Sequence, residues 1–316
     1  MLAAFTISYP RLRGPVHDSG QVREMHDPCL SNASQDERYA GPLGRAAAQR
    51  VLNGGWAILR IPAAVAGQHA AVLAAAHDFF AQPDVAKAAA CDPPTAEGYR
   101  PLGAEYSIAV ERPDLNESFS VWMQNVDRAF PETAGAAADL QAALLDLAVP
   151  LMGIAQTLLS HLAARFAKPG EAPRPVDVTG ATYLQVNRYR PAEADREFLQ
   201  ERHEDGHLIT IHHCRQPGLE IEQSDGCYVP APHGPDQVLV LAGELLTMMT
   251  GHRIPPVHHR VRRHADQGER LSVMLFVNPS LKGRLAPWVD LDVNAVAAGN
   301  PRRFGLPSLD LLLRDE

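Results

Sequence analysis

Apolar positions recur with two different periods along the chain, and the period changes near residue 176. Before this point, apolar side chains recur every three or four residues over 44–53, 65–80 and 140–166, which is typical of helices with one buried face. Beyond it the period falls to two, which indicates short strands at 182–189, 208–211, 218–221, 237–241 and 271–277. Evenly spaced strands after a helical half predict a mainly β, α+β fold in which an antiparallel barrel or a jelly roll is braced by N-terminal helices.

Turn-forming residues divide the chain into three segments, which we interpret as parts of one catalytic unit. Residues 1–176 hold the predicted helices, a buried strand at 56–61 and, over 92–135, mostly loops and short strands. We expect this region to pack on a β core formed by residues 177–280. Residues 281–316 form a C-terminal tail and a candidate lid.

Composition excludes several classes of protein. The chain has 316 residues, of which 21% are charged, and its net charge is −8. This charge argues against a nucleic-acid partner, because phosphate binding needs clustered Lys and Arg. The longest apolar stretch, 140–162, contains Asp146, Pro150 and Gly153, so we expect no membrane span. Four scattered cysteines and no secretory signal predict free thiols in the cytoplasm. No pattern indicates an oligomeric state.

Candidate chemistry concentrates in the stretch that holds nine of the fourteen histidines: His203, His207, His212, His213, His233, His252, His258, His259 and His264. His203 and Asp205 are two residues apart, and alternate side chains of a strand share a face, so both could reach one ion. In Val257–Val261, the same alternation places His259 on the face of the two valines. Two histidines and one carboxylate form the facial triad that is typical of non-haem Fe(II) sites.

The same letters also spell the H-E-x-x-H motif of zinc proteases, from His203 to His207, with His213 where one protease class has a third ligand. That interpretation requires a helix, so that the first two imidazoles stack at positions i and i+4. Gly206 disfavours a helix by about 1 kcal/mol, and Leu208–Ile211 favours a strand. A metal-free binding module, with ordinary surface or core histidines, is a further alternative.

Several sequence pieces between Tyr183 and Pro279 occur in a defined order: Leu184–Pro191, His203–Thr210, Pro217–Ile221, Val240–Leu246 with Thr250 and Gly251, His259–Val261, and the Arg-x-Ser pair Arg270 and Ser272. In this order they resemble the isopenicillin N synthase-like family of Fe(II)/2-oxoglutarate-dependent dioxygenases. Glu244 stands where that family usually has Asp. Weaker similarities extend the resemblance towards residue 40: Gly55-Trp56, Phe79-Phe80 with Pro83 and Lys87, and Asn116–Phe119.

The resemblance implies a double-stranded β-helix, which is a jelly-roll or cupin-like fold, and an Fe(II) ion bound by His203, Asp205 and His259. It also implies 2-oxoglutarate as cosubstrate and O₂ as oxidant. The reaction would couple decarboxylation of 2-oxoglutarate, which yields succinate and CO₂, to hydroxylation, desaturation or ring closure of a small molecule. Oxidases of the isopenicillin N synthase type need no 2-oxoglutarate and also carry Arg-x-Ser, so they remain an alternative.

The resemblance places the distal carboxylate of 2-oxoglutarate on Arg270 and Ser272. Arginine suits this role because its planar guanidinium pairs with a carboxylate through two parallel hydrogen bonds. Fe(II), Asp205 and dianionic 2-oxoglutarate sum to one negative charge, which Arg270 neutralises. Tyr189 and Asn187, on the same face of a predicted strand, are expected to be further hydrogen-bond donors to the cosubstrate.

The substrate contacts are predicted less directly. Candidates from the loop-rich region and the first core strand are Tyr99, Arg100, Glu105, Glu117 and Arg188. His207 is either a pocket residue or a buried histidine with its own partners. High Ala and Pro content leads us to expect a bacterial specialised pathway, such as antibiotic biosynthesis.

Overall fold

The computed structural model describes residues 33–92, 97–123, 135–178, 180–191, 195–231, 234–264, 266, 268–280 and 285–291. The described residues form five α-helices: α1 (Ala33–Gly54), α2 (Ala63–Phe80), α3 (Asp84–Ala89), α4 (Ala136–Phe166) and α5 (Glu244–Met249). The two longest predicted helices are confirmed as α2 and α4, and the helix predicted from Gly44 begins earlier, at Ala33. Of the predicted C-terminal tail, only 285–291 lies within the described residues.

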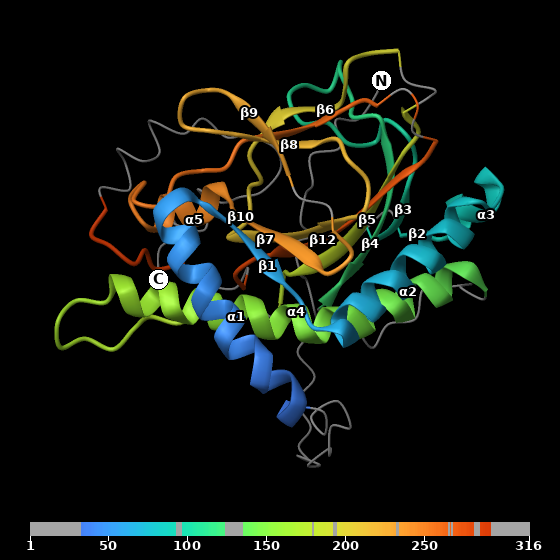
Figure 1. Cartoon of the computed structure of the whole chain (residues 1–316). Coiled ribbons are helices and arrows are strands. Elements are labelled where there is room, and N and C mark those ends of the chain that lie inside the picture. Colours follow the sequence, from blue (N-terminus) through green and yellow to red (C-terminus); the bar gives the residue numbers. More distant parts are fainter. Residues whose placement is uncertain are drawn as a thin grey trace, which may run out of the picture.

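Two antiparallel sheets lie on one side of the long helices (Figure 1). The larger sheet has the order β1 (Trp56–Arg60), β10 (Gln237–Ala242), β7 (Ile209–Cys214), β12 (Arg270–Val277), β5 (Tyr183–Tyr189), β4 (Asn116–Trp122), β3 (Glu97–Arg100) and β2 (Cys91–Asp92). The smaller sheet has the order β6 (Phe198–His203), β11 (His259–Arg262), β8 (Leu219–Glu222) and β9 (Tyr228–Pro230). The jelly-roll arrangement of antiparallel strands braced by helices is therefore confirmed.

The N-terminal region contributes strands as well as helices to this fold. β1, β2, β3 and β4 all precede residue 177, yet they pair directly with each other or with β5 and β10. β4 is buried along its whole length. Periodicity predicted the core strands β5, β7, β8, β10 and β12, but not the edge strand β9, which is short and contains a proline.

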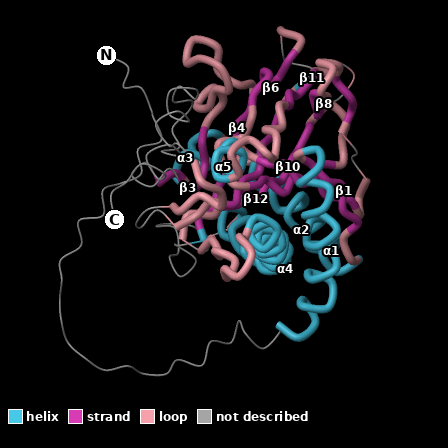
Figure 2. The backbone as a smooth tube through the Cα atoms, turned by 90° about the vertical axis from the view of Figure 1, so that its left-hand side faces the viewer, coloured by secondary structure: helices cyan, strands magenta, loops and turns pink. Residues whose placement is uncertain are grey.

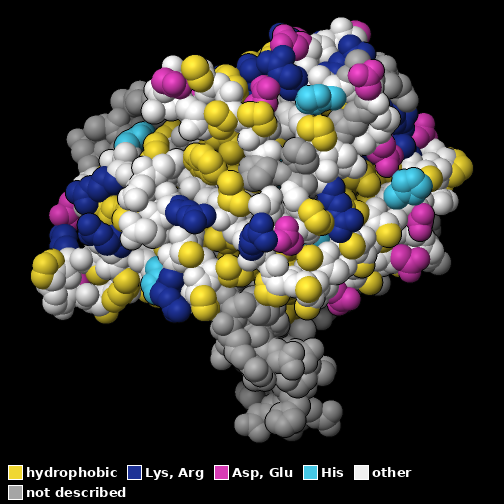
Figure 3. All heavy atoms as spheres, viewed as in Figure 1, with side chains coloured by type: hydrophobic (Ala, Val, Ile, Leu, Met, Phe, Trp, Pro, Cys, Tyr) yellow, Lys and Arg dark blue, Asp and Glu magenta, His cyan; other side chains and the backbone are white. Residues whose placement is uncertain are grey.

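Acidic and basic side chains are interspersed on the face shown in Figure 3.

α4 is a core helix, although its length and apolar composition would also suit a membrane span. Half of its most apolar window is buried within the fold. It packs against α1, α2 and the larger sheet, and Figure 2 views it end-on beside those two helices. Its fully buried positions follow the predicted three- and four-residue spacing: Leu140, Leu144, Leu147, Leu151, Ile154 and Leu158.

The two faces of the larger sheet differ in character, and this difference positions the site. On the face towards the helices, residues such as Val121, Val186 and Val273 belong to the main hydrophobic core. Because side chains alternate along a strand, their neighbours point towards the smaller sheet. These neighbours are mostly polar, and the strand register lines up Ser118, Asn187, Ser272 and Cys214 in one row across β4, β5, β12 and β7.

α1 and α4 cross closely because α1 has a glycine at the crossing. A Cβ atom on Gly44 would lie 2.6 Å from Thr157 Cβ and 2.9 Å from the backbone nitrogen of Leu158. Neither of these atoms belongs to the flexible end of a side chain, so the helices would have to move apart. Gly67 in α2, by contrast, has no atom within 4 Å of such a Cβ.

We expect Gly44→Ala to lower the free energy of unfolding by about 1–3 kcal/mol, as overpacking of a core does. Gly67→Ala is the matched control, and it should raise that free energy by about 0.5–1 kcal/mol because alanine is the better helix former. Urea unfolding followed by circular dichroism measures both. Equal effects of the two substitutions would contradict the close crossing.

Candidate metal centre

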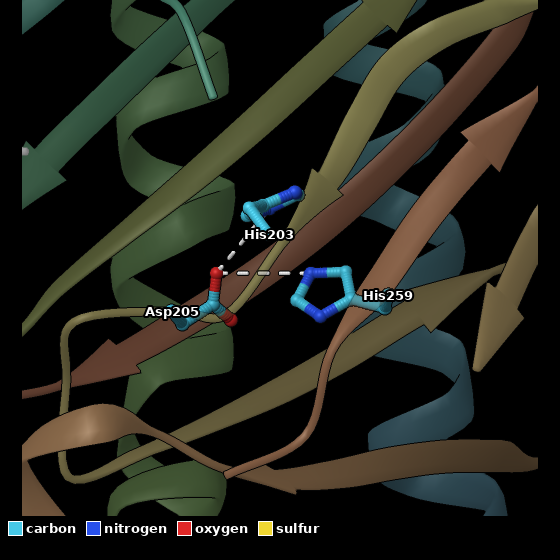
Figure 4. A group of neighbouring side chains, drawn as sticks. All are labelled: His203, Asp205 and His259. Carbon is cyan, nitrogen blue, oxygen red and sulfur yellow. Dashed lines mark ion pairs between the residues drawn. The ribbon is translucent and has the colours of Figure 1, made fainter. Parts of the chain in front are cut away.

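Three candidate metal ligands, His203, Asp205 and His259, meet between the two sheets (Figure 4). His203 ends β6, and His259 begins β11; the two residues are paired in the register of the smaller sheet. Their ring centroids are therefore only 4.2 Å apart. Asp205 Oδ1 lies 3.7 Å from Nε2 of His203 and 3.7 Å from Nε2 of His259. One atom from each residue can thus coordinate one ion, since these atoms all lie within 4.8 Å of one another.

Asp205 reaches this position from a turn, which corrects the expectation that it shares a strand face with His203. β6 ends at His203, and the chain then turns before β7. The backbone of Glu244 donates a hydrogen bond to the Asp205 carbonyl oxygen at 2.7 Å. A Cβ atom on Gly243 would lie 2.1 Å from the His207 carbonyl oxygen, so only glycine lets this turn approach so closely.

The same turn contradicts the zinc-protease interpretation. Residues 203–207 are a strand end followed by a bend, not a helix, so His203 and His207 do not stack one helical turn apart. His207 is instead a buried histidine with its own partners. Its Nδ1 lies 2.8 Å from Asn278 Oδ1, and its ring packs against Phe276 with centroids 4.5 Å apart.

Hydrogen bonds fix which atom of each ligand faces the centre. His203 Nδ1 is 2.7 Å from the carbonyl oxygen of Glu201, and His259 Nδ1 is 3.2 Å from that of Val257. A carbonyl oxygen only accepts, so each Nδ1 carries the proton and each Nε2 keeps its lone pair for an ion. Thr210 donates to Asp205 Oδ2 at 2.5 Å, which leaves Oδ1 directed at the imidazoles.

The protonation states also suit a metal. Burial raises the pKa of Asp205, but the nearby His259, His203 and His207 and the hydrogen bond from Thr210 outweigh it and leave the pKa below its ordinary value. Burial, together with the neighbouring His203, lowers the pKa of His259 to about 4. At neutral pH the carboxyl group is therefore ionised and this imidazole is neutral, and these are the forms that bind metal ions.

A buried arginine lies on the same face of the larger sheet. Arg270 is 0% exposed, and its Nε donates to the Pro217 carbonyl oxygen at 3.1 Å. Its two terminal amino groups are buried and have no hydrogen-bond partner among the described residues. Ser272 lies two residues along β12 and is also buried. Arg270 therefore presents unsatisfied donors that fit a carboxylate, and the Ser272 hydroxyl lies two residues from it on the same strand face.

Tyr189 and Asn187 form the wall beside Arg270. Tyr189 is paired with Arg270 across β5 and β12, and the guanidinium carbon is 5.2 Å from the centroid of its ring. Asn187 donates to the Tyr189 hydroxyl at 3.2 Å, and this hydroxyl donates to Gln200 Oε1 at 3.1 Å. Because Gln200 lies on β6, these bonds join the two sheets next to the metal ligands.

Three predicted substrate contacts lie on the other face of the sheet, which corrects that expectation. Glu117 accepts hydrogen bonds from Lys87 at 2.6 Å, Tyr99 at 2.8 Å and Arg188 at 2.9 Å. This cluster packs under the helices, where the Tyr99 ring contacts Phe79 of α2. Burial raises the pKa of Glu117, but the hydrogen bonds from its cationic and phenolic partners lower it overall. The cluster joins α3 to the sheet and is separated from the metal centre by β4 and β5.

The structure adds a residue that the sequence argument did not assign to the site. His212 follows Thr210 by two positions on β7 and therefore shares its face. It is half-buried and paired with Met274 of β12. Burial and the nearby Arg270 and His259 lower the pKa of His212 well below its ordinary value. Period-two alternation from Thr210 would have identified this position.

Comparisons with known proteins agree on one family. Residues 181–279 match the family model described as the 2OG-Fe(II) oxygenase superfamily. The chain is 31% identical over 116 residues to the 2-oxoglutarate-dependent dioxygenase AOP3 of Arabidopsis thaliana, covering 36% of this chain and 27% of that protein. It is 27% identical over 141 residues to gibberellin 2-beta-dioxygenase 4 of the same plant, covering 40% and 43%. The matches thus span less than half the length of these relatives.

Solved structures show the same fold. A 2OG-Fe(II) oxygenase family protein from Caulobacter crescentus has a TM-score of 0.63 at 21% identity, covering 84% of this chain and 90% of that one. A dioxygenase for auxin oxidation in rice has a TM-score of 0.62 at 19% identity, covering 87% and 94%. Dioxygenase for auxin oxidation 1 from Arabidopsis thaliana, in a binary complex with 2-oxoglutarate, has a TM-score of 0.61 at 20% identity, covering 81% and 95%. The expected double-stranded β-helix is therefore confirmed.

Thr210→Val should lower the affinity for a divalent metal ion about 10- to 100-fold, as loss of a hydrogen bond that orients a ligand does. Titration of the full chain with Mn(II) or Co(II) measures this affinity. Thr247→Val is the matched control, because the Thr247 hydroxyl is buried without a hydrogen-bond partner among the described residues. The affinity of this variant for the metal ion should stay at the wild-type value. Equal affinities of all three proteins would show that Thr210 does not orient Asp205.

Proposed function

We propose that this chain, whose residues 181–279 match the family model of the 2OG-Fe(II) oxygenase superfamily, is an Fe(II)- and 2-oxoglutarate-dependent dioxygenase acting on a small molecule. One observation supports this proposal most strongly. A cluster of two imidazoles and one carboxylate lies beside a buried arginine whose amino groups have no partner among the described residues. The first feature suits a non-haem iron ion, and the second suits a dicarboxylate that also reaches that ion.

The metal would be held by His203, Asp205 and His259. These two nitrogen ligands and one oxygen ligand form the donor set used by non-haem Fe(II) oxygenases, and they would leave further ligand positions for other molecules. When bound, Fe(II) supplies the redox chemistry that couples decarboxylation of 2-oxoglutarate to oxidation of the substrate by O₂. The chain contributes orientation, since the carbonyl partners of both imidazoles and the Thr210 hydroxyl hold the ligands in place.

The cosubstrate would be anchored at its distal carboxylate by Arg270 and Ser272. The amino groups of Arg270 would then gain acceptors, of which they have none among the described residues, and this would recover the cost of burying a cation. Asn187 and Tyr189 are the proposed neighbouring donors, Tyr189 by turning its hydroxyl from Gln200 Oε1 to the cosubstrate. His212, on β7 beside β12, would border the space between this anchor and the metal, and its low pKa keeps it uncharged next to Arg270.

We also propose a cytoplasmic location. The thiols of Cys214 and Cys227 form no disulfide within the described residues, as expected in a reducing compartment; Cys29 lies outside the described residues. The setting in bacterial specialised metabolism rests on composition and stays a prediction.

The central test is succinate formation by the full chain reconstituted with Fe(II), 2-oxoglutarate and O₂, measured in the presence of each compound from a panel of small molecules. His203→Ala and Asp205→Ala should each abolish succinate formation, because each removes one of three ligands. His77→Ala changes an exposed histidine of α2 and should leave the rate unchanged. Substrate oxidation without succinate would instead favour an oxidase of the isopenicillin N synthase type.

Arg270→Ala should raise the 2-oxoglutarate concentration at half-maximal rate more than tenfold, because a charge-assisted hydrogen bond contributes about 1.5–3 kcal/mol. Arg270→Lys should fall between this variant and the wild type, since it keeps the charge but loses the planar pair of donors. Arg60→Ala, which removes an exposed ion pair with Asp236, should change nothing. An unaltered 2-oxoglutarate requirement in Arg270→Ala would place the cosubstrate elsewhere.

A further inference from the structure

One carboxylate of the chain itself already lies among hydrogen-bond donors on the polar face of the larger sheet. It belongs to Glu105, in the connection 101–115 between β3 and β4. Its two oxygens lie within hydrogen-bonding distance of four side chains: Arg100 Nη1 at 3.1 Å, Ser118 Oγ at 3.0 Å, Asn116 Nδ2 at 2.9 Å and Gln185 Nε2 at 3.2 Å. We call these four residues the carboxylate cradle.

The cradle is continuous with the proposed cosubstrate wall. Arg100 is paired with Ser118, and Ser118 is paired with Asn187, so both belong to the row that contains Ser272. Gln185 also donates to Asn187 Oδ1 at 2.8 Å. The cradle therefore faces the space between the sheets, unlike the cluster around Glu117. Of the sequence-predicted contacts from this region, Arg100 and Glu105 lie on this side.

The cradle selects for a negative carboxylate by charge and by donor count. Arg100 and Glu105 have side chains that are 16% and 19% exposed, so their charges are largely shielded from water. Exchange of Glu105 for another carboxylate leaves the net charge and the number of hydrogen bonds unchanged. A neutral or cationic group in its place would remove the acceptors that Asn116, Ser118 and Gln185 use here, and with them the negative charge beside Arg100. This loss costs free energy in a partly buried site.

Glu105 can leave the cradle without disrupting the strands. The later part of the connection is attached to β6 independently, through an ion pair of Arg112 with Glu201 at 2.7 Å and a backbone hydrogen bond from Leu115 to Leu199 at 2.8 Å. The earlier part is exposed over 101–104, and Leu102 is 62% exposed. The backbone of Glu105 is held by a hydrogen bond within the connection, in which Asp114 N donates to the Glu105 carbonyl oxygen at 2.8 Å.

We propose that the cradle is the binding site for a carboxylate of the substrate, and that Glu105 occupies it when no substrate is present. The link to oxidation rests on the function proposed above. In the sheet order β7, β12, β5, the cradle residue Gln185 on β5 is in register with His212 on β7, two strands away, or about 10 Å at ordinary strand spacing. Thr210, which holds the metal ligand Asp205, lies two residues further along β7. The substrate is therefore a carboxylic acid whose reacting carbon lies several bonds from that carboxylate.

Acetate tests the cradle without iron, cosubstrate or turnover. The measurement is the rise in Tm of the full chain with acetate, relative to acetamide at equal ionic strength. The wild-type response gives the baseline, because Arg270 can bind acetate in every variant. Glu105→Ala empties the cradle, so its Tm should rise by about 2 °C more than that of the wild type once acetate is in roughly tenfold excess over its Kd.

Three variants make this result specific. Arg100→Ala combined with Glu105→Ala should return the response to the wild-type baseline. Arg112→Ala, in the same connection but outside the cradle, should keep the wild-type response. If Glu105→Ala does not fold, Glu105→Gln replaces it: glutamine keeps the size of the side chain but removes its charge, so acetate should displace it and raise the Tm more than in the wild type. An acetate response no larger in the Glu105 variants than in the wild type would overturn the cradle.

A second arm tests the substrate class. Compounds that stimulate 2-oxoglutarate consumption should be carboxylic acids whose primary amides do not stimulate, and Arg100→Gln should raise their KM at least tenfold. An uncharged stimulating compound whose KM is unchanged in Arg100→Gln would overturn the assignment to substrate. Acetate binding to the emptied cradle with no Fe(II)-dependent succinate from any compound would leave the cradle standing and reject the dioxygenase proposal instead.

Discussion

The burial of the Arg270 guanidinium is the constraint around which the polar side of the larger sheet is organised. A fully buried cation whose terminal amino groups lack partners among the described residues costs several kcal/mol. The protein meets this cost only in part, through one carbonyl oxygen and the face of the Tyr189 ring. A bound dicarboxylate would remove the remainder. A site that is incomplete without its cosubstrate is the physical form that dependence on 2-oxoglutarate would take.

The metal ligands depend on a second constraint, which is the register between strands that are distant in sequence. His203 and His259 are adjacent because β6 and β11 pair at those residues. Asp205 joins them because Gly243 lets the turn before β7 pack tightly against the start of α5. On each of two sides of the metal centre, an arginine is placed to balance the negative charge of a carboxylate. Arg270 would offset the cosubstrate, and Arg100 offsets the carboxylate in the cradle, whether it comes from Glu105 or from a substrate.

Much of the fold follows from local patterns in the sequence. The spacing of leucines predicted α4, and period-two alternation located β5, β7, β10 and β12. Alternation placed Asn187 and Tyr189 on the cosubstrate face of β5, and the same rule puts Arg188 on the opposite face, where it is found. For Glu117 and Tyr99 the loop-rich region gave no assigned face, so the sequence could not show that both lie beneath the helices.

The sequence by itself indicated the type of chemistry that the chain can support. Folding alone does not require this order and spacing of metal-binding and carboxylate-binding residues: His203, Asp205, His259, Arg270 and Ser272. Their side chains act through atoms that lie a few ångströms apart, and such distances between remote segments arise only when strands pair and sheets stack. The tertiary structure therefore decided that Asp205 approaches from a turn and that His212 borders the site. It also decided that Glu105 lies in a cradle of donors, because those donors come from three strands that only the folded sheet brings together.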